Sequence, residues 1–188
     1  MFTRSVLLLC WLLGLTVLPA QALSIHLLPS ARSLLVGQTF TVDIVLTELR
    51  AGRDPADEVL AFGLNTILSA PIVQLLDTTL APPFVAPAMP LDDTDIAGLA
   101  FPGLRSDPLL LATLTLQALS PGMTTLETLT DPDLNLNHGL FFALSPDPVA
   151  LNASLALTVV TPEPATLLLL GSSLLGLLAC RWRRLGWR

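Results

Sequence analysis

Lysine and tyrosine are absent from the chain of 188 residues, and cysteine occurs only twice, at Cys10 and Cys180. Both cysteines lie in hydrophobic segments near the two ends, so the long region between them has neither a disulfide nor a Cys-based zinc site. The three tryptophans, Trp11, Trp182 and Trp187, lie in the same end segments. Because lysine and tyrosine are among the side chains that act as general acids and bases, their absence narrows the catalytic chemistry open to the chain.

Positive charge is scarce in the body of the chain, residues 23–161. Four arginines face fourteen acidic residues there, which gives a net charge of about −10. The arginines are Arg32, Arg50, Arg53 and Arg105, and the acids are Asp43, Glu48, Asp54, Asp57, Glu58, Asp77, Asp92, Asp93, Asp95, Asp107, Glu127, Asp131, Asp133 and Asp147. Such a surface repels nucleic acid and anionic lipid, so we exclude both as partners of this region.

The N-terminal segment has the parts of a secretory signal peptide. Arg4 supplies the positive charge, an apolar stretch follows from Val6 to Leu18, and Ala20 and Ala22 provide the small-x-small pattern that signal peptidase accepts. We therefore expect residues 1–22 to be a signal peptide that is removed on export. An uncleaved N-terminal membrane anchor is the alternative.

The C-terminal segment contains Pro162-Glu163-Pro164, an uncharged apolar run over 165–180, and a basic end over 181–188. At about 1.5 Å per residue the run makes a helix of roughly 24 Å, slightly shorter than the roughly 30 Å core of a bilayer. Arginines at such a position stay in the cytoplasm, which places the region before the helix outside. The sequence therefore predicts a single-pass exported protein with a transmembrane helix at 165–180.

These C-terminal features together resemble the PEP-CTERM sorting signal of Gram-negative bacteria that make exopolysaccharide. The resemblance depends on the order of three parts: the Pro162-Glu163-Pro164 triplet, the apolar run, and the cluster Arg181, Arg183 and Arg184. It implies that the membrane enzyme exosortase recognises the triplet and processes the tail, and that the arginines stop transfer. Residues 186–188 extend beyond the usual basic cluster. A plain membrane anchor with a chance Pro-Glu-Pro is the alternative.

The region between the two end segments shows the alternation typical of half-buried strands. In TFTVDIVL, residues 39–46, every second residue is apolar on one face. Comparable runs occur at 23–28, 59–68, 72–76, 96–101, 109–119, 123–129, 140–144 and 149–160, bounded by Pro, Gly, Asp or Asn. The sequence therefore predicts an all-β fold, a β-sandwich with eight or nine strands over residues 23–160.

Four segments of this region are similar to cohesin modules, which are sandwiches of the jelly-roll type. They are VGQTFTVDIVL at 36–46, LAFGL at 60–64, and LATLTL at 111–116 with PGMTTL at 121–126. These motifs are mostly packing patterns. Cohesins bind dockerin modules through one sheet face, but no residue here identifies that face.

Two acidic segments are candidates for calcium. Asp131, Asp133, Asn135 and Asn137 place an oxygen-bearing side chain at every second residue, and residues 92–95 concentrate three carboxylates. The first segment is not an EF-hand, because it lacks the glycine and the bidentate acid of that motif. The alternative is that both segments are solvated turns, in which Asp and Asn bond to their own backbone.

No catalytic residue is identified. The two histidines, His26 and His138, are far apart in sequence, and neither a nucleophile elbow nor a phosphate loop occurs before the tail. A carboxylate pair for glycoside hydrolysis stays open, but Trp and Tyr, which usually stack on sugars, are absent from 23–161. The phenylalanines of this region, Phe40, Phe62, Phe84, Phe101, Phe141 and Phe142, are mostly in core-like positions. The proline-rich segment 81–90 is expected to be an extended surface loop.

The sequence therefore predicts an exported cell-envelope or extracellular-matrix protein, structural or adhesive and not an enzyme. We expect signal peptidase and exosortase as processing enzymes, the membrane as a contact of the C-terminal helix, and exopolysaccharide or another envelope protein as a partner. A carbohydrate-binding module and a polysaccharide hydrolase are the two alternatives.

Overall fold

The computed structural model describes residues 23–161 together with Ser172, Ser173 and Leu175, which are helical. The predicted signal peptide, with Ala20 and Ala22, lies outside the described residues. So do the sorting triplet at 162–164, most of the predicted helix at 165–180, and the arginines at 181, 183 and 184. Among the residues that the structure does describe, no helix has the length and apolar character needed to cross a bilayer.

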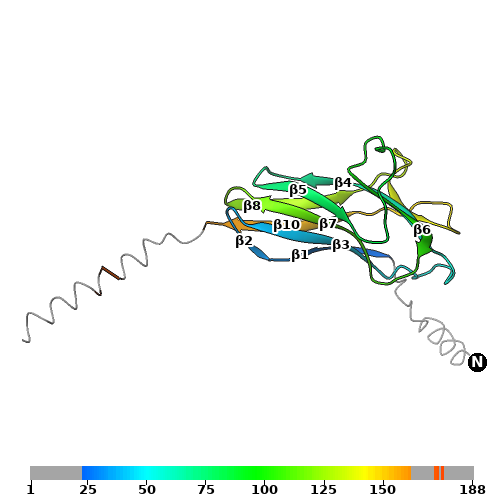
Figure 1. The fold of residues 1–188 in the computed structure, drawn as a ribbon, viewed down its shortest axis with the longest axis horizontal. Helices are drawn as coiled ribbons and strands as arrows, with labels where there is room; N and C mark the ends of the chain where they lie inside the picture. The colour runs from blue at the N-terminus through cyan, green and yellow to red at the C-terminus, as the bar shows by residue number, and fades with distance from the viewer. Residues whose placement is uncertain (1–22, 162–171, 174, 176–188) are drawn as a thin grey trace, which may run out of the picture.

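Ten strands form two sheets that pack face to face, as Figure 1 shows. The strands are β1 (Ser24–Pro29), β2 (Ser33–Leu35), β3 (Thr39–Thr47), β4 (Val59–Leu68), β5 (Val73–Leu80), β6 (Ile96–Leu104), β7 (Leu109–Ala118), β8 (Gly122–Leu129), β9 (Gly139–Phe142) and β10 (Ala153–Val160). The four-stranded sheet has the order β1-β3-β7-β5 and the six-stranded sheet the order β2-β10-β8-β4-β6, with β9 also on β4. The prediction of an all-β sandwich is confirmed.

All strand pairs are antiparallel except β2 with β10. One edge of β4 is shared by two partners in succession. β8 pairs with residues 65–68 of β4, and β9 pairs with residues 59–63. β8 and β9 therefore lie one after the other along the same edge of β4, and the loop at 130–138 connects them.

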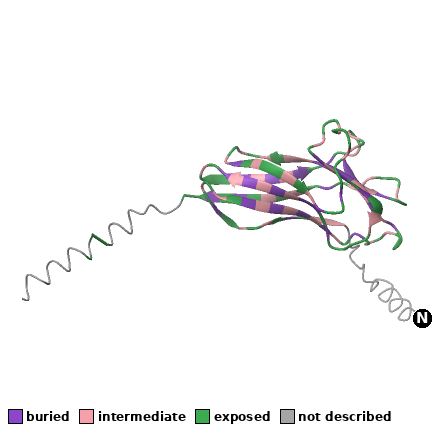
Figure 2. Cartoon of the chain, viewed as in Figure 1, coloured by how far each residue is buried: buried purple, intermediate pink, exposed green. Residues whose placement is uncertain are grey.

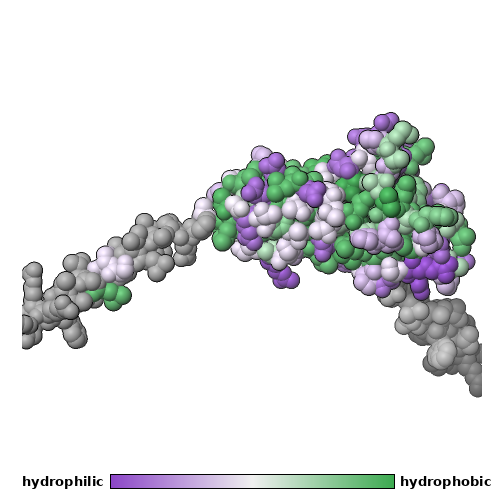
Figure 3. Space-filling model, in the orientation of Figure 1, coloured by the Kyte–Doolittle hydropathy of each residue, from purple (hydrophilic) through white to green (hydrophobic). Residues whose placement is uncertain are grey.

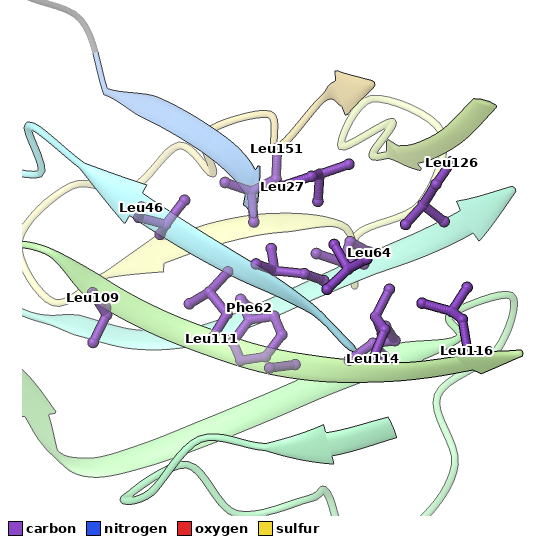
Figure 4. Close-up of a cluster of buried hydrophobic side chains, with 14 of the residues drawn as sticks. Leu27, Leu46, Phe62, Leu64, Leu109, Leu111, Leu114, Leu116, Leu126 and Leu151 are labelled. Carbon is purple, nitrogen blue, oxygen red and sulfur yellow. The ribbon is translucent and has the colours of Figure 1, made fainter. Parts of the chain in front are cut away.

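The core lies between the sheets and is built by the alternation read from the sequence. In β3 the side chains of Phe40, Val42, Ile44 and Leu46 are buried, and the residues between them are not. Figure 2 shows the same banding along the strands of the sandwich. Leucines from both sheets meet Phe62 in the middle of this layer (Figure 4). Burial of apolar side chains, without any disulfide, holds the two sheets together.

Each predicted run coincides with a strand, but one strand was not predicted and several strand bounds differ from the prediction. β2 was missed, because a strand of three residues has too few positions to show alternation. β5 extends to Leu80 instead of ending at Leu76, since a register shift between Leu75 and Asp77 changes the phase of its pattern. β10 begins at Ala153; Val149, expected within it, forms only an isolated bridge to Leu140.

The two ends of the sandwich differ in composition. At the end where β10 stops, the turns at 36–38, 69–72 and 119–121 connect the strands, and we call this the exit end because the chain leaves the sandwich there. The opposite end, which we call the loop end, carries the segments 48–58, 105–108 and 143–148. β1 starts at the loop end, where Ser24 pairs with Thr47.

Candidate functional site

Two acidic segments that are 35 or more residues apart in sequence lie against each other on β4. Asn65 connects one of them to the sheet: its Nδ2 donates to Asp93 O (3.1 Å), and its Oδ1 accepts from the Asp95 N–H (2.8 Å). Asn135, in the 130–138 loop, donates to Asp92 O (3.0 Å) and Asp93 O (3.3 Å). The sequence treated these two segments as separate candidates, and the structure brings them together.

His138 is the buried centre of this contact. Its Nε2 lies 2.8 Å from Asp93 O, and its Nδ1 lies 3.2 Å from the Asp131 backbone nitrogen. A carbonyl only accepts and a backbone N–H only donates, so the ring carries its proton on Nε2 and accepts on Nδ1. Both nitrogens are therefore used to hold two loops together. This is a structural use of the histidine, while His26 lies exposed on β1 beside Thr47.

The backbone of β4 leaves room for this loop only because residue 63 is a glycine. A Cβ at Gly63 would collide with the carbonyl oxygen of Asn137 and would also touch the Thr94 side chain. Asn137 therefore sits directly on the outer face of β4. The close approach positions the whole 130–138 loop over the six-stranded sheet.

The four residues predicted to bind calcium form a turn in this loop. The Asp131 carboxylate accepts from the Leu134 N–H (3.2 Å), and the Asn135 Oδ1 accepts from the Asn137 N–H (2.9 Å). These are local backbone bonds of the kind that favours Asp and Asn in turns. Within the described residues, no group of three or more His, Cys, Asp or Glu side chains converges as a metal site would need. A calcium site at Asp131, Asp133, Asn135 and Asn137 stays a prediction.

A second polar network ties the segments of the loop end together around Asp57. Its buried carboxylate accepts from the Ser145 hydroxyl (2.7 Å), the Leu144 N–H (2.8 Å) and the Glu58 N–H (3.0 Å). Burial alone would raise the pKa of Asp57, but these hydrogen bonds and the charge of Arg53 outweigh it and hold the pKa below the ordinary value of 3.8. The carboxylate is thus fixed in its ionised form as a structural element.

Arg53 completes this network from the other side. It donates to the Ser145 hydroxyl (3.0 Å), and its guanidinium carbon lies 4.0 Å from the centre of the Phe142 ring. The ring contact is a cation–π interaction. Nearby, Arg105 and Glu58 form an ion pair at 2.7 Å. The arginines of the loop end are thus engaged in holding loops.

A cavity of about 360 Å³ opens between the sheets beside β5. Its polar lining residues are Thr66, Thr78 and Asp95, and its apolar lining residues are Leu68, Leu75, Ile96, Leu114, Leu116 and Leu126. Asp95 is the one ionisable group in this lining. Glycoside hydrolysis generally uses two carboxyl groups, so this cavity does not offer the arrangement required by the hydrolase alternative.

Sequence reasoning missed an exposed apolar strip along β6. Phe40, Phe62, Phe84 and Phe142 are buried as expected, but the Phe101 side chain is 99% exposed. Leu99 and Val85 are exposed beside it and bond to each other through their backbones (2.8 and 2.9 Å). The proline-rich segment at 81–90 is therefore not entirely at the surface. Val85 pairs with β6, and the Phe84 ring packs on the Phe62 ring with their centres 4.9 Å apart. The apolar residues at alternate positions 99 and 101 were the signal of this strip.

Comparison with known proteins identifies the tail. The family model of the PEP-CTERM protein-sorting motif matches residues 160–184. The match includes the triplet at 162–164 and the arginines at 181, 183 and 184, and it stops before the trailing residues 186–188. No curated protein sequence matches the chain. The predicted resemblance of the tail is confirmed.

Solved structures identify the fold of the described domain. A cohesin module from a family 33 glycoside hydrolase of Clostridium perfringens is 11% identical, with a TM-score of 0.53 over 74% of this chain and 96% of that module. A non-cellulosomal cohesin from Archaeoglobus fulgidus is 16% identical, with a TM-score of 0.41 over 76% of this chain and 96% of its own. A type I cohesin–dockerin complex from Clostridium thermocellum gives 10% identity and a TM-score of 0.38 over 73% of this chain and 99% of the matched chain.

At these identities the likeness concerns the fold, and the first of these structures carries it. The sorting motif begins at Val160, the last residue of β10, so the two parts follow each other directly. The chain is therefore a cohesin-type β-sandwich followed by a PEP-CTERM sorting motif, which marks it as an exported protein sorted to the cell envelope.

Proposed function

We propose that the protein is a structural or adhesive component of the cell envelope, delivered by its tail and acting through binding rather than catalysis. The apolar run at 165–180 anchors the precursor in the membrane, and the arginines at 181, 183 and 184 remain in the cytoplasm. Exosortase then recognises Pro162-Glu163-Pro164 and processes the tail. The match of the sorting motif to residues 160–184 carries this proposal.

The domain itself supports a binding role. Its polar networks at His138 and Asp57 use their side chains to hold loops in place. The exposed strip at Val85, Leu99 and Phe101 offers apolar surface on β6. Exposed apolar patches of this kind are typical of protein–protein contacts. We therefore propose another envelope protein as the partner.

The processing step is tested by breaking each part of the tail separately. Replacing Pro162, Glu163 and Pro164 with Ala removes the residues that keep the segment extended, because proline prevents a helix from continuing back toward the domain. We expect this variant to stay anchored and unprocessed in a host that has exosortase. Intact mass of the membrane-bound protein measures the outcome, and Thr161→Ser serves as the matched control that is processed normally.

The basic end is tested in the same host. Replacing Arg181, Arg183 and Arg184 with Ser removes the charges that stop transfer, so the tail should pass through the membrane and the protein should leave it.

If the variant with Ala at 162–164 is trimmed at the same position and rate as the original, the triplet is not a recognition element. Specific micromolar binding on a glycan array would instead favour the carbohydrate-binding alternative.

A further inference from the structure

The exit end of the sandwich carries no charge in the part of the chain that the structure describes. The turns there are Val36-Gly37-Gln38, Ser69-Ala70-Pro71-Ile72 and Leu119-Ser120-Pro121. At the loop end, by contrast, the segments 48–58, 105–108 and 143–148 hold Glu48, Arg50, Arg53, Asp54, Asp57, Glu58, Arg105, Asp107 and Asp147. The charge of the domain is thus concentrated away from the tail.

Exposed apolar side chains surround the point where the chain leaves the exit end. Leu35 and Val160 are neighbours in the register of β2 and β10, and Met123 lies one strand further, on β8. Leu119 lies in the adjoining turn. All four are exposed, Met123 by 73%. Figure 3 shows apolar residues at this end beside the grey tail, and strongly hydrophilic residues toward the other end.

The acids of the neighbouring strands lie away from the exposed apolar residues of this end. Asp43 and Asp77 lie four residues along their strands from Thr39 and Val73, and Glu127 lies four residues from Met123. Asp95 bonds to Thr66, which is in register with Thr128, five residues from Met123 along β8. Four residues of strand span about 13 Å, which exceeds the Debye length of about 8 Å at physiological salt. The negative net charge of the surface as a whole is therefore largely screened at Leu35, Leu119 and Met123. Arg32, which lies one residue before β2, is three residues from Leu35 along the chain and carries a positive charge.

Only a short stretch of chain separates the exit end from the apolar run of the tail. The Val36 N–H donates to Val160 O (3.2 Å), so the chain is fixed to the sandwich up to its last strand residue. Five peptide steps separate Val160 from Ala165, where the apolar run begins. A fully extended chain covers at most about 18 Å in five steps. An inserted tail thus keeps the exit end within about 18 Å of the start of the apolar run.

We propose that the exit end rests on the surface of a phospholipid bilayer in the unprocessed precursor, with Leu35, Leu119 and Met123 at the depth of the headgroups. This contact orients the sandwich with its charged loop end away from the membrane. It also holds Pro162-Glu163-Pro164 at the membrane surface, where a membrane enzyme can reach the triplet. The inference rests on the proposed anchoring by the tail and adds the orientation of the domain to it.

Fluorescence quenching in vesicles tests this contact with the tail in place. The chain from Leu23 to Arg188 is purified from a host that lacks exosortase, with Cys180→Ser so that a single introduced cysteine can be labelled. A label at Met123→Cys is compared with a label at Leu144→Cys, which is equally a surface position but lies at the loop end. In phosphatidylcholine vesicles with spin-labelled headgroups, we expect quenching at position 123 to exceed that at position 144 several-fold.

A charged substitution distinguishes a membrane contact made by Leu35, Leu119 and Met123 from tethering by the tail alone. Leu119→Asp, at an exposed position, should lower the quenching at position 123 to the value at position 144 while the circular dichroism spectrum stays unchanged. Equal quenching at both positions, or no effect of Leu119→Asp, overturns the inference. Flotation with the vesicles reports the anchoring independently: a chain that floats with equal quenching refutes the contact alone. A chain that does not float refutes both the anchoring and the contact.

Discussion

Replacing the buried carboxylate of Asp57 by an amide is expected to destabilise the domain without changing its shape. In Asp57→Asn the three hydrogen bonds from Ser145, Leu144 and Glu58 lose their charged acceptor, and one amide nitrogen is turned toward a donor. Hydrogen bonds to charged groups contribute roughly 1 kcal/mol more each than neutral ones. Because an amide costs less to bury than a carboxylate, part of this loss is offset. We expect the free energy of unfolding to fall by about 2 kcal/mol.

Urea unfolding of residues 23–161, which contain both sheets and the whole buried cluster, measures this loss. For a domain of this size, about 2 kcal/mol corresponds to a fall in Tm of roughly 8 °C. Asp54→Asn is the matched control, because Asp54 is an exposed acid of the same segment with one local bond, to the Ala56 N–H. Exposed substitutions of this kind change stability by about 0.5 kcal/mol or less.

The pH dependence of the difference between the two proteins identifies the carboxylate as its cause. The pKa of Asp57 is lowered on folding, so its ionised form stabilises the native state at every pH above the unfolded value of about 3.9. This contribution is lost as the pH falls through the lower pKa of the folded state. The gap between the original domain and Asp57→Asn should therefore persist from pH 7 to pH 5 and close below about pH 3.9. A gap that is absent at pH 7, or that stays constant in acid, refutes this account.

Three further predictions concern the loops on β4. His138→Ala removes both ring nitrogens that bridge the two loops and should cost about 1–3 kcal/mol in urea unfolding, whereas exposed His26→Ala should change little; equal effects would contradict the bridging role. Gly63→Ala pushes a methyl group into the Asn137 carbonyl and should cost about 1–3 kcal/mol, which unfolding measures; a neutral result would mean that the loop is not held there. If the 131–137 loop binds calcium, the ion at a hundred times its dissociation constant should stabilise the domain by about 2.7 kcal/mol, and an unchanged Tm at millimolar calcium removes the site.

Most of the fold could be predicted because its strands carry their own pattern. β3 alternates in apolar residues, and the bounds of β4 agree with the sequence prediction at both ends. A bulge makes such a strand hard to predict, as β5 shows. Alternation from Val73 and Leu75 would place Thr78 on the outer face, but the register shift after Leu75 changes the phase, so the polar Thr78 lines the cavity. β2 exists only because β10 is there to pair with it.

The contact between the two acidic segments could not be predicted from the sequence. It depends on side chains that bond to backbone carbonyls more than forty residues away, as His138 does to Asp93. Such bonds leave no periodic signal, and the Asp and Asn residues around them look the same in an isolated turn. The exposed Phe101 was missed for a related reason, since an aromatic residue in a strand pattern is usually buried.

The positions of the two chain ends on the sandwich also determine how the domain would carry a mechanical load. Ser24 begins β1 at the loop end and Val160 ends β10 at the exit end, so a force between them runs along the strands. The hydrogen bonds between strands are perpendicular to that direction. The pairs that join β10 to β8, from Ala153 to Val159, would then be sheared together rather than opened one after another. A domain held at one of these ends and pulled at the other thus resists as a block.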